Sequence, residues 1–87
     1  MNLKGDFIVR EIGGESFLVP IGEAAQKFSG LFMLDEVGAF IWSRLAAGED
    51  EGRIVAAILE EYEVSRDEAA ADVSEFLQKL RDMGVLE

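Results

Sequence analysis

The sequence contains no histidine and no cysteine. Histidine is the usual general base near neutral pH, and cysteine is the usual thiol nucleophile and a frequent ligand of zinc and iron. We therefore expect no catalytic residues, no bound metal and no cofactor. The absence of cysteine also rules out disulfide bonds, as is common for proteins of the cytoplasm.

Basic residues are scarce, and long apolar runs are missing. Eight Lys and Arg stand against eighteen Asp and Glu, so the formal net charge is −10, which opposes binding to nucleic acid. The carboxylates are scattered, as on a solvated surface. No apolar run approaches the roughly 20 residues that cross a bilayer, and the first six residues form no signal segment. We therefore expect a cytoplasmic protein that does not bind membranes.

The length and the apolar content bound the architecture. With 87 residues, of which 49% are hydrophobic, the chain predicts a single domain, residues 1–87, with one small core.

The central feature is a predicted helix within residues 33–48. Asp35 is typical of an N-cap, because its carboxylate accepts hydrogen bonds from the open N–H groups of the first turn, and Gly48 is placed to end the helix in a left-handed conformation. At 100° per residue, the apolar side chains cover a broad arc. This arc predicts a core helix, with Trp42 structural on its flank; the arc contains Val37, Phe40, Ile41 and Leu45.

The residues before this helix have the pattern of strands. Two apolar runs, 6–12 and 15–21, flank Gly13-Gly14, which predicts a hairpin with a two-residue turn. Residues 22–27 are interpreted as a connection. A third strand is predicted at 28–34, where four consecutive apolar residues place side chains on both faces.

The residues after it predict two more helices. Residues 52–62 carry apolar side chains at i, i+3, i+4 and i+7, and Ser65 with Glu68 fits a capping box that begins a third helix. Gly84 is placed to end that helix, and residues 85–86 continue as a short extended tail. Each helix has a stripe of apolar side chains that is predicted to be buried. The stripe contains Val55, Ile58, Leu59 and Tyr62 on the first helix, and Ala69, Val73, Phe76, Leu77, Leu80 and Met83 on the second.

This order of elements defines the predicted fold class. Three strands followed by three helices predict an α+β domain in which a three-stranded antiparallel sheet lies beside a small helical bundle. The last two helices, joined by a short turn, form a helix-turn-helix unit, so the fold is of winged helix-turn-helix type.

The segment Leu34-Asp-Glu-Val-Gly-Ala-Phe-Ile-Trp42 resembles the coenzyme PQQ synthesis protein D family, whose members carry Leu-Asn-x-x-Gly-x-x-x-Trp there. The resemblance extends along nearly the whole chain, through the Gly-Gly hairpin, the acidic turn after Gly48, the helix with Asp72-Val-Ser-Glu-Phe-Leu and the Gly84-Val-Leu ending. Asp35 replaces the family's usual Asn, and the frequent Thr near residue 51 is absent.

The resemblance implies a non-catalytic peptide chaperone, a recognition element for ribosomally synthesised and post-translationally modified peptides such as the precursor of PQQ. It implies that the leader of a precursor peptide binds as an extra strand beside the third strand, in a cleft bounded by the third helix. The domain then presents the peptide to a modifying enzyme, often a radical S-adenosylmethionine (SAM) enzyme. The peptide-binding residues that it implicates are Gly30, Leu31, Phe32, Met33, Leu34, Leu77, Leu80 and Arg81.

The predicted third strand also suits a peptide for physical reasons. Strand addition needs an accessible edge with unpaired N–H and C=O groups and side-chain pockets at alternate positions. The alternative is that residues 31–34 are simply buried on both faces and that Lys79 and Arg81 are solvated.

Two other functions share the predicted fold. A winged-helix DNA-binding or transcription-associated domain would place the third helix in the major groove, but acidic residues outnumber basic ones there. A structural subunit would dimerise through the free strand edge or by exchanging its hairpin. The expected oligomeric state is a monomer or a weak homodimer.

Overall fold

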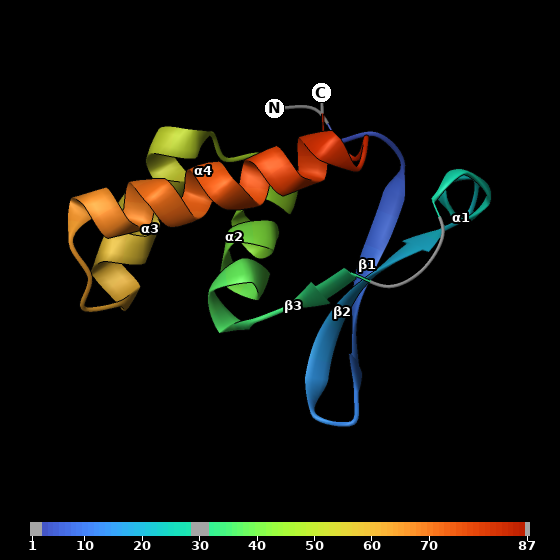
Figure 1. Cartoon of the computed structure of the whole chain (residues 1–87), viewed down its shortest axis with the longest axis horizontal. Coiled ribbons are helices and arrows are strands. Elements are labelled where there is room, and N and C mark those ends of the chain that lie inside the picture. Colours follow the sequence, from blue (N-terminus) through green and yellow to red (C-terminus); the bar gives the residue numbers. More distant parts are fainter. Residues whose placement is uncertain (1–2, 29–31, 87) are drawn as a thin grey trace.

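The computed structural model describes residues 3–28 and 32–86 (Figure 1). The strands form one antiparallel sheet in the order β1-β2-β3, and α2, α3 and α4 pack together beside it. The predicted α+β class is confirmed, and the winged-helix description is compatible with this order. The elements are β1 (Asp6–Ile12), β2 (Glu15–Ile21), α1 (Ala24–Lys27), β3 (Phe32–Leu34), α2 (Glu36–Ala46), α3 (Glu51–Glu61) and α4 (Arg66–Asp82).

The hairpin of β1 and β2 has the predicted bounds. Its register runs from Asp6 opposite Ile21 to Ile12 opposite Glu15. The two glycines between the strands have φ values of +62° and +83°. Positive φ at both central positions is what a tight hairpin turn with the right twist requires, so the Gly-Gly pair explains the turn.

The connection to β3 differs from the prediction. Residues 24–27 form the short helix α1, and Ala24 is buried against the backbone at Gly5, where an added Cβ would lie 2.9 Å from the Ala24 Cβ. Phe28 lies outside any strand and donates its N–H to the Ala24 carbonyl. The predicted start of the third strand at Phe28 is therefore wrong. The described strand is Phe32–Leu34, and Ser29, Gly30 and Leu31 lie outside the described residues.

Side-chain caps begin the three longer helices. Asp35 accepts from the Gly38 N–H at 2.7 Å, and Ser65 accepts from the Glu68 N–H at 3.1 Å, as predicted. Asp50 caps α3 by accepting a hydrogen bond from the N–H three residues later, a role not predicted for the acidic turn. The helix therefore starts at Glu51, one residue earlier than predicted.

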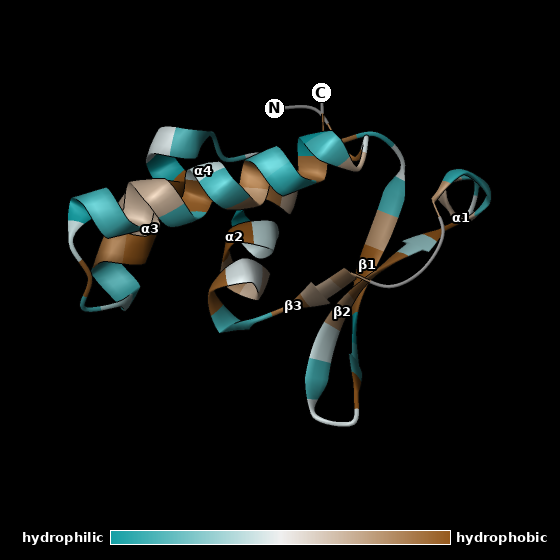
Figure 2. Ribbon diagram, viewed as in Figure 1, coloured by the Kyte–Doolittle hydropathy of each residue, from teal (hydrophilic) through white to brown (hydrophobic). Residues whose placement is uncertain are grey.

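The core lies where the three helices meet the sheet. Trp42 is 5% exposed and packs edge-on against Phe7, with ring centroids 6.0 Å apart, so its predicted burial is confirmed. Met83, placed in the buried stripe by prediction, is 39% exposed and is the C-cap residue that follows α4. Along α4, hydrophobic and hydrophilic residues alternate around the helix (Figure 2). The largest fully buried side chains are those of Leu18, Ile41, Ile54, Ile58, Val73, Leu77, Leu80 and Val85.

The segment after α4 packs against the start of the described chain. Gly84 has a φ of +80° and turns the backbone out of the helix, as predicted. Leu86 then forms an antiparallel bridge with Leu3, and the Lys4 N–H donates to the Val85 carbonyl at 2.7 Å. No helix in residues 3–28 and 32–86 is long and apolar enough to span a membrane.

Candidate functional site

The strand β3 lies at the edge of the sheet. Its one described neighbour is β2, with Leu18 opposite Phe32, Phe17 opposite Met33 and Ser16 opposite Leu34. Within the described residues no strand pairs with its other side. An edge strand offers unpaired backbone donors and acceptors to another chain, so this edge is a candidate for strand addition.

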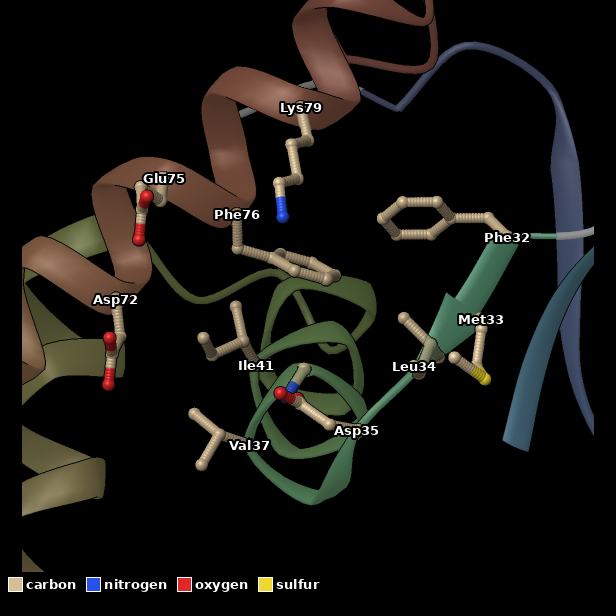
Figure 3. Close-up of a pocket in the computed structure, with 11 residues that line it drawn as sticks. Phe32, Met33, Leu34, Asp35, Val37, Ile41, Asp72, Glu75, Phe76 and Lys79 are labelled. Carbon is tan, nitrogen blue, oxygen red and sulfur yellow. The ribbon is translucent and has the colours of Figure 1, made fainter. Parts of the chain in front are cut away.

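A cavity of about 300 Å³ opens beside this edge, between β3, the first half of α2 and one side of α4 (Figure 3). The strand and α4 lie on opposite sides of it, and α2 lies at its base. Its lining mixes apolar and charged side chains from all three elements: Phe32, Met33, Leu34, Asp35, Val37, Gly38, Ile41, Asp72, Glu75, Phe76 and Lys79.

Two aromatic rings and one glycine shape the cavity. The rings of Phe32 and Phe76 have centroids 6.1 Å apart and are tilted by 51°. A Cβ on Gly38 would lie 3.3 Å from a Phe76 ring carbon and 3.1 Å from the Asp35 carboxylate oxygen that caps α2. Glycine thus lets the start of α2 approach α4 closely without displacing the ring or the cap.

Charged side chains of α4 border the same cavity. Asp72, Glu75 and Lys79 are spaced at i, i+3 and i+7, which places them on one side of the helix, and all three are exposed. Lys79 points toward the space between the two rings, whereas the carboxylates lie on the far side of Phe76 (Figure 3). Within the described part of the chain, none of the three forms an ion pair.

A second hollow of about 530 Å³ lies near the end of β3. It lies between the hairpin turn and the start of α2, and it shares Met33, Leu34 and Asp35 with the first cavity. The two hollows therefore meet at the end of β3.

The structure places only some of the peptide-binding residues implied by the resemblance at the cavity. Phe32, Met33 and Leu34 line the cavity, whereas Gly30 and Leu31 lie outside the described residues.

The predicted residues of α4 do not line the cavity. Leu77 and Leu80, which the resemblance implicates in peptide binding, are both 0% exposed and belong to the core. Arg81 is exposed and does not line the cavity. The helical period explains this difference. Residues 73, 77 and 80 lie on the side of α4 that faces α2 and α3, whereas the residues that line the cavity lie on the neighbouring side of the same helix.

The cavity side of α4 was not predicted as a site. Phe76 belonged to the predicted buried stripe, and Asp72, Glu75 and Lys79 read as polar surface. The signal that identifies them is their spacing, because 72, 75, 76 and 79 form one row of i, i+3, i+4 and i+7 along the border of the buried stripe. Gly38 also contributes to the site, through its close approach to Phe76.

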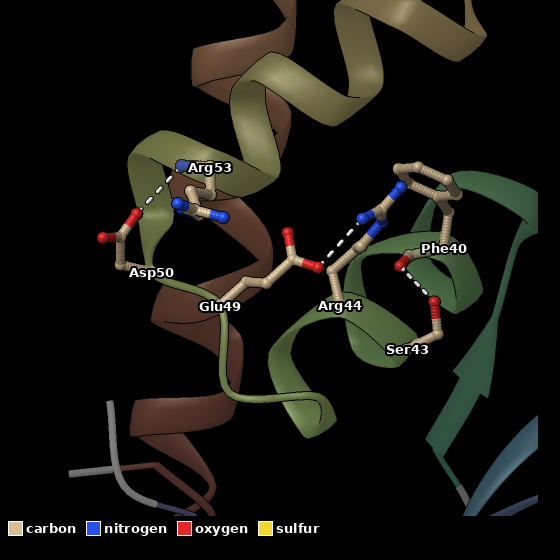
Figure 4. Close-up of polar contacts among 6 residues, drawn as sticks. All are labelled: Phe40, Ser43, Arg44, Glu49, Asp50 and Arg53. Atoms are coloured by element: carbon tan, nitrogen blue, oxygen red, sulfur yellow. Dashed lines mark hydrogen bonds and ion pairs between the residues drawn. The ribbon is translucent and has the colours of Figure 1, made fainter.

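A salt bridge lies away from the cavity, at the corner between α2 and α3 (Figure 4). Arg44 pairs with Glu49 at 2.9 Å and lies 5.3 Å from the Phe40 ring centroid. The hydrogen bond and charge of Glu49 raise the pKa of Arg44. Burial, together with the nearby Glu36 carboxylate, raises the pKa of Tyr62. None of these side chains lines the first cavity, so this corner is structural.

Residues 3–28 and 32–86 contain no group of three or more Asp and Glu side chains arranged to hold a metal ion. The cavity presents backbone groups of β3, the rings of Phe32 and Phe76, and charged side chains along its rim.

Comparison with known proteins identifies relatives of the chain. The family model described as coenzyme PQQ synthesis protein D (PqqD) matches residues 5–86. A structure described as TbiB1 in complex with the TbiA(beta) leader peptide is 32% identical, with a TM-score of 0.78, and the match covers 100% of this chain and 95% of that one.

A second structure, lasso peptide synthetase B1 complexed with the leader peptide, is 21% identical, with a TM-score of 0.74 and coverage of 97% and 93%. At that identity the likeness concerns the fold alone. No curated protein matches the sequence.

Proposed function

We propose that this chain, which belongs to the coenzyme PQQ synthesis protein D family, is a non-catalytic peptide chaperone that binds the leader of a ribosomally synthesised precursor peptide. The relative TbiB1, 32% identical along the whole chain, is described in complex with a leader peptide, which supports this function. The observation that carries it here is that β3 has one edge without a pairing strand among the described residues, beside a cavity lined by apolar, aromatic and charged side chains.

The mechanism is the addition of the leader as a fourth strand. Micromolar affinity requires about 8 kcal/mol, whereas each backbone hydrogen bond contributes only about 0.5–1.5 kcal/mol net of water. The described part of β3 has three residues, so its backbone alone falls short. Each apolar side chain that becomes fully buried adds about 1.5–3 kcal/mol. Leader side chains must therefore enter the cavity, while the backbone pairing sets the direction.

The proposed binding residues follow from this mechanism. Phe32, Met33 and Leu34 supply the backbone edge, and Phe76 and Val37 supply apolar surface for the side chains of the leader. Leu77 and Leu80 act indirectly, because they hold α4 against the core.

The partner that follows is a peptide-modifying enzyme, of the radical SAM class or another, to which the loaded domain presents the rest of the precursor. In this proposal residues 1–87 act as one peptide-binding domain in the cytoplasm, and catalysis belongs to the partner.

The alternative of a DNA-binding winged helix is not favoured. The helix that would enter the major groove, α4, carries five acidic residues against three basic ones. Two of these acidic residues, Asp72 and Glu75, lie on the cavity side of α4, so that side would repel phosphates.

Titration of the isotopically labelled domain tests the proposal, with the TbiA(β) leader peptide and a library of random displayed peptides as probes. The expected result is saturable binding with amide shifts in β3 and on the cavity side of α4. Met33→Asp should abolish binding, because a charge on an edge strand discourages pairing. Ile12→Asp is the matched control, since Ile12 is 51% exposed and Met33 is 58% exposed. Shifts that cluster elsewhere, or the absence of any saturable binder, would contradict the proposal.

A further inference from the structure

The rim of the cavity carries opposite charges at its two ends. Asp72 and Glu75 lie on one side of the Phe76 ring, and the ammonium group of Lys79 lies on the other, toward Phe32 (Figure 3). In the described chain these groups have no ion-pair partner, although all three are exposed and Glu75 and Lys79 are only four residues apart along the helix. They are therefore available to a ligand in the cavity.

The spacing of these charges matches that of an extended peptide. Four residues of α-helix rise about 6 Å, which separates Glu75 from Lys79 along α4. Alternate residues of a β-strand lie about 6.6–6.8 Å apart and point to the same face. A strand added to β3 would lie between β3 and α4, so two of its alternate side chains would meet these two groups.

We infer that the cavity selects leader segments in which an acidic and a basic side chain are two residues apart. The acidic side chain pairs with Lys79, and the basic one pairs with Glu75, with Asp72 as a further acceptor. This inference rests on the proposed function, and it adds the chemical class of the peptide. Its structural basis is the match between the charge pair on α4 and the repeat of a β-strand.

A pair of opposite charges in the leader would fix the register in which the leader pairs with β3. A backbone ladder is the same at every residue, so a strand can slip by two residues without exposing its apolar side chains. Two opposite charges remove this freedom, because a slipped or reversed peptide places like charges together. The leader would then be held in one position, and the modifiable part of the precursor would emerge from the domain at a fixed residue.

Exchange of the two charges tests the inference. The double variant Glu75→Lys/Lys79→Glu keeps the composition and net charge, and both side chains are exposed, so the fold is expected to survive. The probe is a display library of random peptides, selected separately on the wild-type and exchanged proteins. The wild-type protein should enrich an acidic and a basic residue two positions apart in one order, and the exchanged protein should enrich the opposite order.

A control exchange, Lys27→Glu/Glu63→Lys, reverses the same types of charge away from the cavity and should keep the wild-type order. Synthetic peptides with the two charge orders should then differ about tenfold in affinity for each protein, and added salt should reduce the difference.

The outcomes separate this inference from the proposed function. Peptides that bind in the cavity, as shown by amide shifts in Phe32 and Phe76, but have no charge order would refute the inference and leave the proposed function standing. Identical peptides from the wild-type and exchanged proteins would do the same. If no protein enriches any peptide for the cavity, both the proposed function and the inference are refuted.

Discussion

Replacement of Trp42 by alanine tests whether the cavity depends on a core side chain that does not touch it. Trp42 lies on α2, is 5% exposed and packs edge-on against Phe7 of β1. It does not line the cavity. The residue therefore joins the sheet to the helix that forms the base of the site, and its removal should affect peptide binding only through stability.

The expected loss is large compared with the stability of a small domain. Truncation of a buried Trp to Ala costs about 3–5 kcal/mol. At roughly 0.05–0.15 kcal/mol per residue, an 87-residue domain has a total stability of about 4–13 kcal/mol. The Trp42→Ala protein should thus lose between about a quarter and all of its free energy of unfolding. Trp42→Phe keeps a ring against Phe7 and should lose less.

Urea denaturation followed by circular dichroism measures the effect, because Trp42 is the only tryptophan and its fluorescence disappears in the variant. The folded fraction of Trp42→Phe should bind peptide as the wild-type protein does. A Trp42→Ala protein with an unchanged denaturation midpoint and no peptide binding would refute this reasoning, since it would place Trp42 in the binding site.

Three further predictions concern the site and the corner beside it. Gly38→Ala should lower the melting temperature, because the cost of crowding the Phe76 ring and the Asp35 cap, about 1–3 kcal/mol, exceeds the gain of about 1 kcal/mol that alanine brings to a helix; a raised melting temperature would contradict this packing. Neighbouring N–H groups of a strand point to opposite sides, so of the two variants Phe32→Pro and Met33→Pro one should unfold and the other should stay folded but lose peptide binding. Two folded variants with unchanged affinity would place the peptide elsewhere. Tyr62 should titrate above its usual pKa of about 10 in an ultraviolet titration, and a midpoint at or below 10 would exclude its burial beside Glu36. Its contribution to the free energy of unfolding should be complete below pH 10 and be lost as the pH rises through the folded-state pKa.

Local chemistry explains why most of the fold was predictable. The Gly13-Gly14 pair and the caps at Asp35 and Ser65 act over two to four residues, and their structural roles are the predicted ones. The helix α1 was missed because its four residues are too few to show a helical period. Ala24 is buried there by contact with Gly5, a neighbour in space that the local pattern does not indicate.

The cavity was less predictable because it depends on which side of a helix faces which neighbour. Phe76 and Leu77 are adjacent and differ by 100° around α4, and both fit an apolar stripe. Only the packing of α2 and α3 decides that Leu77 is fully buried while Phe76 borders the cavity. The role of Gly38 could not be predicted for the same reason. Its small size is needed because of the ring of Phe76, which is distant in the sequence.

The bridge between Leu3 and Leu86 brings the two ends of the described chain together at one side of the molecule. A short linker between these ends would therefore allow circular permutation, with the chain opened between Gly13 and Gly14, where an added side chain would meet no neighbour within 4 Å. In such a protein β2, β3 and all the helices would be made before β1. All residues of β3 and of the cavity would then precede β1 in the chain, and the Phe7 ring that packs on Trp42 would belong to the last segment made.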